Sequence, residues 1–299
     1  MDREFAVRGL GPRSRDIHAR LNCWTQNPIV KSDTNTMTHN YHRLIELWRK
    51  CPLDQSSFIL PEDKAKIPEE VVSTFHSLDE YTSSSTFGQR DDTSLHVGLL
   101  PVPYVGNLQN ASVFILMLNP GLSPGDYFAE YEVTQFREAH IRNLLQENTN
   151  DEFPFLFLDP RFAWHPGFEY WQRKLDDIAQ ALADQERVSY QKALRHLAQN
   201  VACLELMPYH SKSFGAGQLL KQLPSVKAMR EYVTDVLSPK AKNNEVTIVA
   251  TRGVQYWDLS QHENIVVFRG HEPRAAHLNL KSRGGKAIAN QLGLKSKTE

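Results

Sequence analysis

Residues 111–127 read ASVFILMLNPGLSPGDY, and this stretch decides the fold class. Val113 to Leu118 are apolar and partly β-branched, and Asn119-Pro120-Gly121 follows them directly. This pattern is typical of a buried strand that stops at a tight turn. In open parallel sheets, ligands bind just beyond the carboxyl ends of the strands. Asn119, directly after the strand, is therefore the first candidate for a functional side chain.

Three further apolar runs predict strands, and helical patterns separate most of them. The strands are predicted at 201–207, 246–251 and 265–268, and the helices at 134–146, 168–183, 187–199, 225–237 and 282–292. Strands that alternate with helices indicate a parallel sheet covered on both faces. The prediction is an α/β fold, in which three layers (α/β/α) enclose a four-stranded, mainly parallel sheet.

The chain before this domain reads differently. Residues 1–38 are polar without a sustained period and predict an arm, and residues 39–94 predict a helical extension. Within the extension, helices are expected at 41–50 and 61–76 and a loop at 79–94. Pro101 and Pro103 interrupt the apolar segment 95–105, which favours an edge strand or extended lead-in to the main domain, 95–299.

Composition limits the class of protein. The 299 residues carry a net charge of −1, but residues 119–186 hold 5 Lys and Arg against 13 Asp and Glu, while residues 269–299 hold 7 against 2. One end could therefore meet phosphate, although a solvated basic helix explains the same charge. The three cysteines lack metal-ligand spacing, so no metal site is expected. Residues 1–16 lack the apolar core that a secretory signal needs, and no uncharged apolar run reaches membrane-spanning length, so a cytoplasmic protein without a membrane partner is expected.

Two motifs in order suggest a family. The Asn119-Pro120-Gly121-Leu122 turn follows a buried strand, and Trp164-His165-Pro166-Gly167 later leads into a helix through Phe168 and Trp171. This order resembles the uracil-DNA glycosylase superfamily, most closely its mismatch-specific branch, whose first motif reads GINPGL. The resemblance covers roughly residues 112–292, with a longer insertion between the two motifs. His165-Pro166 is interpreted as a helix start rather than a catalytic pair.

The resemblance implies a monofunctional DNA glycosylase that flips a modified or mismatched pyrimidine out of the duplex and replaces the base with water. Such a reaction needs a positioned water, a site that tolerates a sugar cation and a stabiliser for the departing base. Asn119 can orient the water but is no strong base, which predicts either a slower enzyme than relatives with Asp there or one that relies on an easily departing base. No cofactor or metal is needed, and DNA is the expected partner.

The resemblance also implies contacts with the base. Leu118, Pro120 and Gly121 are expected around it, and Gly121 replaces a bulky Tyr of the uracil-specific relatives. The open wall predicts a substituted pyrimidine, including a bulky modified base of foreign (phage) DNA. Phe162 or Trp164 is expected to stack on the base, with Tyr127 and Phe128 as rivals and core packing as the alternative.

Later segments supply the remaining candidates. His210 follows the second strand and is expected to contact the base edge, unless it is only a satisfied loop histidine. After the last strand, either His271 or His277 stabilises the leaving base, although the Ser-containing part of the family's third motif is missing. The expected DNA contacts are Ser211, Lys212, Ser213, Arg274 as the wedge that fills the duplex, and Ser282, Arg283 and Lys286 at a helix start, where a plain helix cap is the alternative.

Two other functions stay open. The missing third motif also fits a catalytically silent recognition module for nucleic acid or a protein partner, and the neutral overall charge fits a small-molecule nucleoside hydrolase. The identity of the base, repair against defence, strand preference, oligomeric state and the role of residues 1–94 are not determined by the sequence.

Overall fold

The computed structural model describes residues 33–272 and 277–295. For residues 33–39 the backbone alone is described. The described strands are β1 (Val72–Ser73), β2 (Leu95–His96), β3 (Tyr104–Val105), β4 (Val113–Met117), β5 (Val201–Glu205), β6 (Thr247–Ala250) and β7 (Ile265–Val267). The described α-helices are α1 (Asp33–Trp48), α2 (Pro61–Lys64), α3 (Leu78–Thr82), α4 (Pro124–Glu132), α5 (Thr134–Leu144), α6 (Pro166–Glu186), α7 (Tyr190–Asn200), α8 (Pro224–Tyr232), α9 (Ser238–Lys242) and α11 (Arg283–Gln291).

The main sheet is a mixed one with strand order β3-β5-β4-β6-β7. The last four strands are parallel, and β3 pairs antiparallel with β5, with Tyr104 opposite Leu204. The prediction of four strands was therefore wrong by one. The fifth strand, β3, lies within segment 95–105, which was expected to form an edge strand or an extended lead-in. Tyr104 and Val105 follow Pro103 and, unlike proline, have backbone N–H groups with which to pair with β5.

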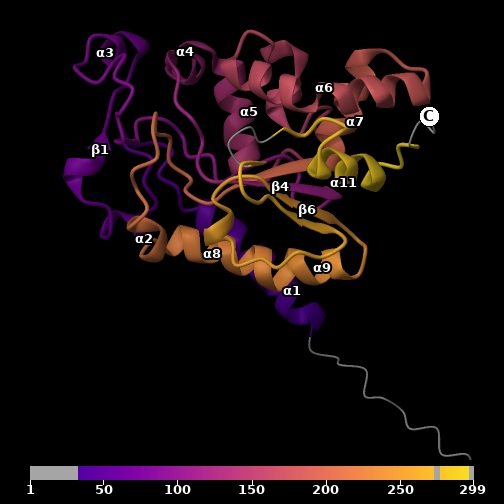
Figure 1. Ribbon diagram of the computed structural model, residues 1–299. Helices are drawn as coiled ribbons and strands as arrows, with labels where there is room; N and C mark the ends of the chain where they lie inside the picture. Colours follow the sequence, from indigo (N-terminus) through magenta and orange to yellow (C-terminus); the bar gives the residue numbers. More distant parts are fainter. Residues whose placement is uncertain (1–32, 273–276, 296–299) are drawn as a thin grey trace, which may run out of the picture.

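Helices cover both faces of this sheet, with α1, α8 and α9 on one side and α5, α6 and α7 on the other (Figure 1). The strand side chains alternate between the two cores. In β4, Phe114 and Leu116 join the core under α1 and α8, whereas Val113, Ile115 and Met117 join the core under α6 and α7. Both faces of β4 are thus buried, which explains why its sequence is apolar throughout.

Helix α6 is the longest described helix, and its sequence explains both its ends and its buried face. His165 caps its N-terminus, Pro166 occupies the first turn, and Arg187 ends it in the left-handed conformation. Its buried side chains follow the helical spacing, at Phe168, Trp171, Leu175, Ile178, Ala179 and Leu182. The helix start at His165-Pro166 was predicted, and the structure confirms it.

Several predicted elements differ from the observed ones. The helix expected at 61–76 is only α2, a 3-10 turn (η1, Glu69–Val71) and β1, since its apolar residues lack a continuous stripe. The expected loop 79–94 contains most of α3, and the polar arm ends earlier, because residues 33–38 already belong to α1. Residues 1–32 of the arm lie outside the described part.

The N-terminal extension packs closely against the main sheet domain. Leu44 and Trp48 of α1 are buried in the same core as Tyr232 of α8. Asp63 of α2 is fully buried and accepts hydrogen bonds from the Ser225 backbone N–H, at 3.0 Å, and from the Tyr209 hydroxyl, at 2.8 Å. The extension is thus joined to the segment that follows β5.

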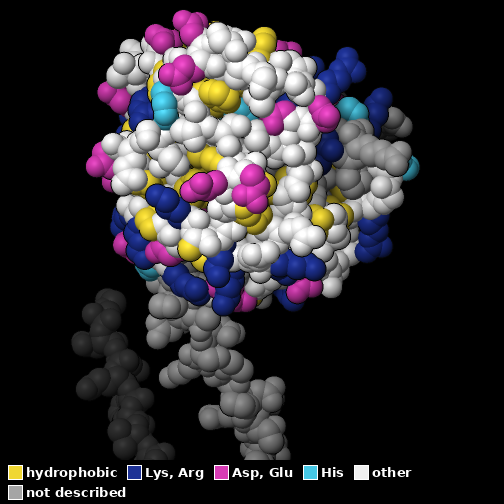
Figure 2. Space-filling model, turned by 90° about the vertical axis from the view of Figure 1, so that its left-hand side faces the viewer, with side chains coloured by type: hydrophobic (Ala, Val, Ile, Leu, Met, Phe, Trp, Pro, Cys, Tyr) yellow, Lys and Arg dark blue, Asp and Glu magenta, His cyan; other side chains and the backbone are white. Residues whose placement is uncertain are grey.

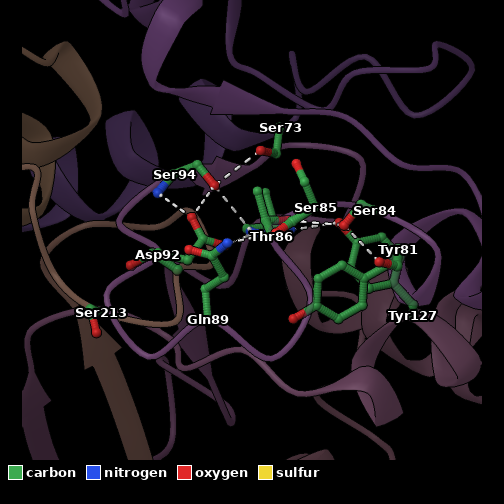
Figure 3. Close-up of polar contacts among 12 residues, drawn as sticks. Ser73, Tyr81, Ser84, Ser85, Thr86, Gln89, Asp92, Ser94, Tyr127 and Ser213 are labelled. Carbon is green, nitrogen blue, oxygen red and sulfur yellow. Dashed lines mark hydrogen bonds and ion pairs between the residues drawn. The ribbon is translucent and has the colours of Figure 1, made fainter.

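A polar network orders the rest of the extension (Figure 3). Ser94 donates to Asp92 at 2.6 Å and contacts Ser73 at 2.9 Å. Asp92 also meets Nε2 of the buried His96, whose Nδ1 lies 2.8 Å from the Tyr127 hydroxyl of α4. Tyr127 in turn stacks on Tyr81 of α3, with ring centroids 4.8 Å apart. This network ties the extension to the helix that follows the Asn119 turn.

Candidate functional site

A pocket of about 630 Å³ opens at the carboxyl ends of the parallel strands. If the four parallel strands are numbered in chain order, they lie in the order 2-1-3-4 across the sheet. The first of them, β4, therefore lies between β5 on one side and β6 on the other, and the strand order reverses there. Such a switch point leaves a crevice beyond the strand ends, where α/β proteins bind ligands. The pocket is lined there by Met117 and Asn119 from β4 and its turn, by Cys203 and Glu205 from β5, and by Arg252 after β6.

Asn119 lies on this pocket with its amide fixed in orientation. Its Nδ2 donates to the Pro120 carbonyl and to Ser211 Oγ, both at 2.9 Å. A carbonyl oxygen only accepts, so the amide nitrogen must face Pro120. Both N–H groups are then used, and Oδ1 is the remaining atom of this side chain that can accept a hydrogen bond from a ligand or a water.

His210 lines the same pocket and holds the turn from the other side. Its Nδ1 lies 2.8 Å from the Gly121 carbonyl and must therefore carry the proton. Nε2 of the neutral ring is then an acceptor, and it donates only when the ring is charged. The contact of His210 with a base edge stays a prediction, and the hydrogen bond to Gly121 is the kind of contact that the loop-histidine alternative expects.

Ser211 was predicted to contact phosphate, and the structure places it elsewhere. It is 2% exposed, and its Oγ accepts the hydrogen bond from Asn119. The neighbouring Ser213 donates to the Arg90 carbonyl of the extension at 2.7 Å. Of this segment, Lys212 is exposed. Ser211 thus positions Asn119, while Lys212 keeps the surface position that a phosphate contact requires.

Glu205, which the sequence analysis missed, lies at the end of β5 and lines the pocket. Its Cα is the register partner of Met117, so the two side chains share the face of the sheet under α6. Glu205 is 6% exposed, and burial raises the pKa of its carboxyl well above the usual value. Oε1 accepts a weak hydrogen bond from Cys203 Sγ at 3.7 Å, and Oε2 is buried without a partner among the described residues.

Charged and aromatic side chains surround this carboxyl. Tyr170 of α6 and Arg252 line the pocket, and the Lys174 ammonium lies 4.9 Å from the centre of the Tyr170 ring. Burial, together with repulsion from Arg252, lowers the pKa of Lys174 to about 8. Arg252 is placed by Gly253, whose φ is +57° and where an added Cβ would lie 2.8 Å from Leu118 Cδ1. A glycine is needed at this turn.

The aromatic wall of the pocket differs from the predicted one. Phe157 and Trp171 line it near α6, and Phe214 lines it as well. The predicted stacking residue Phe162 is 2% exposed and does not line the pocket, because it fills the core against Phe136. Tyr127 is likewise fully buried, in the contact with Tyr81 and His96.

Trp164 and Phe128 pair on the surface, outside the pocket. Their rings meet edge to face with centroids 5.5 Å apart, and they are 44% and 41% exposed. Neither residue lines the pocket, so in this arrangement neither ring stacks on a ligand bound there. Stacking by Phe157, Tyr170 or Phe214 fits the observed positions better.

The turn itself has the predicted relation to the pocket. Leu118, Pro120 and Gly121 all line it. A Cβ added at Gly121 would meet no atom within 4 Å, so this side of the pocket is open. Two side chains cap the helices that begin nearby: Asp126 accepts from the Ser123 N–H in α4, and His165 accepts from the Gly167 N–H in α6.

The C-terminal candidates are not brought to the pocket. His271 and His277 are exposed and do not line it, and Arg274 lies outside the described residues. The Arg283 guanidinium donates two hydrogen bonds to the Glu272 carboxylate, from Nη2 at 2.8 Å and from Nε at 3.0 Å. These hydrogen bonds lower the pKa of Glu272 to about 2. Ser282 caps α11 by accepting from the Gly285 N–H. Lys286 is exposed.

The side of the molecule that carries α2, α3 and α4 has an uneven charge (Figures 1 and 2). Lys and Arg side chains gather along its lower edge, and acidic side chains lie mainly above them (Figure 2). In the described part of the chain, no helix is both long and apolar enough to cross a membrane, and no three His, Cys, Asp or Glu side chains are grouped as a metal ion would need.

Comparisons of the chain with protein-family models, with curated proteins and with solved structures found no match.

Proposed function

We propose that the protein is a monofunctional DNA glycosylase with a fold of the uracil-DNA glycosylase type, which excises a modified or mismatched pyrimidine and leaves an abasic site. The observation that carries this proposal is the orientation of Asn119. Its two N–H groups are held by Pro120 and Ser211, so Oδ1 is kept as an acceptor at the pocket. A fixed neutral acceptor of this kind orients a water for attack on a sugar carbon.

The chemistry matches what the pocket provides. Cleavage of an N-glycosidic bond builds positive charge on the sugar and negative charge on the departing base, so the site must separate the two. Asn119 faces the pocket at the end of β4, and Glu205 and Arg252 lie at the ends of the two adjacent strands. A base held between these strand ends would have polar groups on its edge and a water on its sugar.

The pocket suits a substituted base. Its volume of about 630 Å³ falls in the range of roughly 300–1,000 Å³ that small-molecule sites occupy. The open side at Gly121 leaves room for a substituent on the pyrimidine ring. These features support bulky modified bases, such as those of foreign DNA, as substrates.

A small-molecule nucleoside hydrolase is the second candidate, and surface charge favours it. Asp126 and Glu169 line the pocket together with Arg173 and Arg252, so its lining has no excess of positive charge to attract a phosphate backbone. The salt dependence of binding separates the two candidates, because a protein that contacts several phosphates binds more weakly as salt rises.

The deciding experiment is base release from DNA duplexes that contain uracil, mismatched thymine, hydroxymethylated cytosine or glucosylated cytosine. Abasic sites are scored by alkaline strand cleavage, for the intact protein and for Asn119→Ala. Cleavage on at least one substrate, reduced more than about a hundredfold in the variant, is expected if Asn119 positions the water.

Three outcomes contradict the proposal or the role of Asn119 in it. DNA binding without any abasic site would favour a recognition module, and neither binding nor cleavage, with hydrolysis of free nucleosides, would favour the nucleoside enzyme. Cleavage that persists in Asn119→Ala would place the catalytic water elsewhere.

A further inference from the structure

Glu205 is an unexplained group in the pocket. A carboxyl that is 6% exposed and has one oxygen without a partner is costly, because water no longer solvates it and no donor replaces the water. Buried polar groups in proteins are normally hydrogen-bonded. The unpartnered Oε2 is itself closed to solvent, but Glu205 lines the pocket, so rotation of its carboxyl toward a bound ligand would supply the missing partner.

The surroundings favour a proton on this carboxyl. Burial raises its pKa, and the opposing effects of Lys174 and Arg252 are smaller. The titratable groups that face this carboxyl are Cys203 on its own strand, Tyr170 and Lys174 on α6, and Arg252 after β6. The other titratable residues that line the pocket are Asp126, His165, Glu169, Arg173 and His210. A neutral carboxylic acid offers one O–H donor and one C=O acceptor side by side.

We propose that Glu205 is the general acid that protonates the departing base, and that the preferred base carries an amino group beside a ring nitrogen, as cytosine does. This inference rests on the proposed function. The O–H of Glu205 donates to the ring nitrogen N3, and its C=O accepts from the 4-amino group. Carboxylate side chains accept from the same amino group when proteins bind cytosine in DNA.

The step balances without a cofactor. The bond between N1 and C1′ breaks and its electron pair stays with the base, while the proton of Glu205 moves to N3, so that the base leaves neutral. The water held by Asn119 gives its oxygen to C1′, and its released proton returns to the Glu205 carboxylate. The products are the free base, an abasic site and a regenerated acid.

The substrate class follows from leaving-group chemistry. A base of the uracil type departs as a comparatively stable imide anion and gains little from an acid. An aminopyrimidine departs poorly as an anion, but its N3 is basic enough to accept a proton. A proton donor at the base edge therefore matters most for the aminopyrimidine.

The test uses a matched pair of duplexes that contain either 5-hydroxymethylcytosine or 5-hydroxymethyluracil, which differ only at position 4 of the ring. Single-turnover rates are measured for the wild type, Glu205→Gln and Asn119→Ala. Glutamine keeps a donor and an acceptor of the same shape but cannot transfer its proton. Glu205→Gln should reduce release of 5-hydroxymethylcytosine by about 10²- to 10⁴-fold, leave duplex binding nearly unchanged, and affect 5-hydroxymethyluracil by less than about tenfold.

The wild type provides a measurement that does not depend on a variant's folding. Its rate on 5-hydroxymethylcytosine should fall as the pH rises through the raised pKa of Glu205, because the proton donor is lost. The rate on 5-hydroxymethyluracil should lack this fall. A Glu205→Gln rate equal to that of the wild type, a missing pH effect, or preference for 5-hydroxymethyluracil would overturn the inference while the glycosylase proposal stands. Release of neither base nor of any base in the larger panel would instead contradict the glycosylase itself.

Discussion

The hydroxyl of Ser211 accepts a hydrogen bond from the amide of Asn119 at 2.9 Å, although 92 residues separate the two in the chain. The contact joins the turn after β4 to the segment after β5, and Ser211 N also lies 3.4 Å from the Pro120 carbonyl. Ser211 is therefore a positioning residue, and Asn119 depends on it for its orientation.

Ser211→Ala should lower kcat by about 10- to 100-fold with little change in KM, because Asn119 loses one of the two acceptors that hold its amide. Single-turnover kinetics on the best substrate would measure this. Ser213→Ala is the matched control, since Ser213 donates to the Arg90 carbonyl and not to Asn119. Equal losses in both variants would mean that the loop, and not the contact with Asn119, matters.

Gly121→Tyr should exclude bases with large C5 substituents while release of plain uracil is retained. The reason is that the pocket is open beside Gly121, so a phenol ring can enter the space that a substituent needs. Gly121→Ala is the control and should change little, because its Cβ meets no atom within 4 Å. Relative rates on 5-hydroxymethylcytosine, glucosylated cytosine and uracil give the answer, and a uniform loss on all three would contradict it.

Glu205→Gln should make the protein more stable than the wild type at neutral and alkaline pH. The pKa of Glu205 is raised in the folded protein, so its folded-state carboxyl binds a proton more tightly than the unfolded one. Its favourable effect on the free energy of unfolding is therefore complete below the pKa of the unfolded carboxyl, about 4.3, and is lost as the pH rises through the folded pKa. The stability advantage of the variant should therefore grow with pH and vanish in acid. Thermal unfolding between pH 4 and 9 measures it, at about 2–4 °C per kcal/mol. A constant difference between the two proteins would argue against the raised pKa.

Asp63→Ala should destabilise the fold by about 2–4 kcal/mol, because the buried Ser225 N–H and Tyr209 O–H both lose their acceptor. The adjacent Glu62→Ala is the control, with an expected loss below about 1 kcal/mol, since Glu62 forms a partly exposed ion pair with Lys50. Urea unfolding would compare the two. Similar losses would show that α2 as a whole, and not the Asp63 contacts, carries the effect.

The sequence predicts the parallel strands and the long helices well, because they bury continuous apolar runs or regular stripes. It predicts the short elements poorly. Helix α4 was not among the predicted helices, although Ser123 and Asp126 form a capping box that marks a helix start. The fifth strand was uncertain because two residues form too short a pattern.

The site was predicted in part, for reasons of the same kind. The strand pattern alone placed Asn119 near the pocket, whereas His210 was placed there by the second strand together with the family resemblance. Glu205 was missed because it lies within the apolar run VACLELM, which was interpreted only as a buried strand. Its charge, the single one in this run, was the one signal that could have marked it as a functional residue. The aromatic residues could not be sorted into core and wall, since Phe157 and Phe162 are similar in sequence and only the packing of the loop separates them.

The contacts of Tyr127 have a mechanical consequence for the pocket. The extension reaches both helical layers, with Trp48 in the core under α8 and Tyr81 stacked on Tyr127 of α4. Ser123 and Asp126, at the start of α4, line the pocket. Outward movement of α4 would break the Tyr81 stack and the His96 hydrogen bond together, so the extension braces this wall of the pocket against displacement.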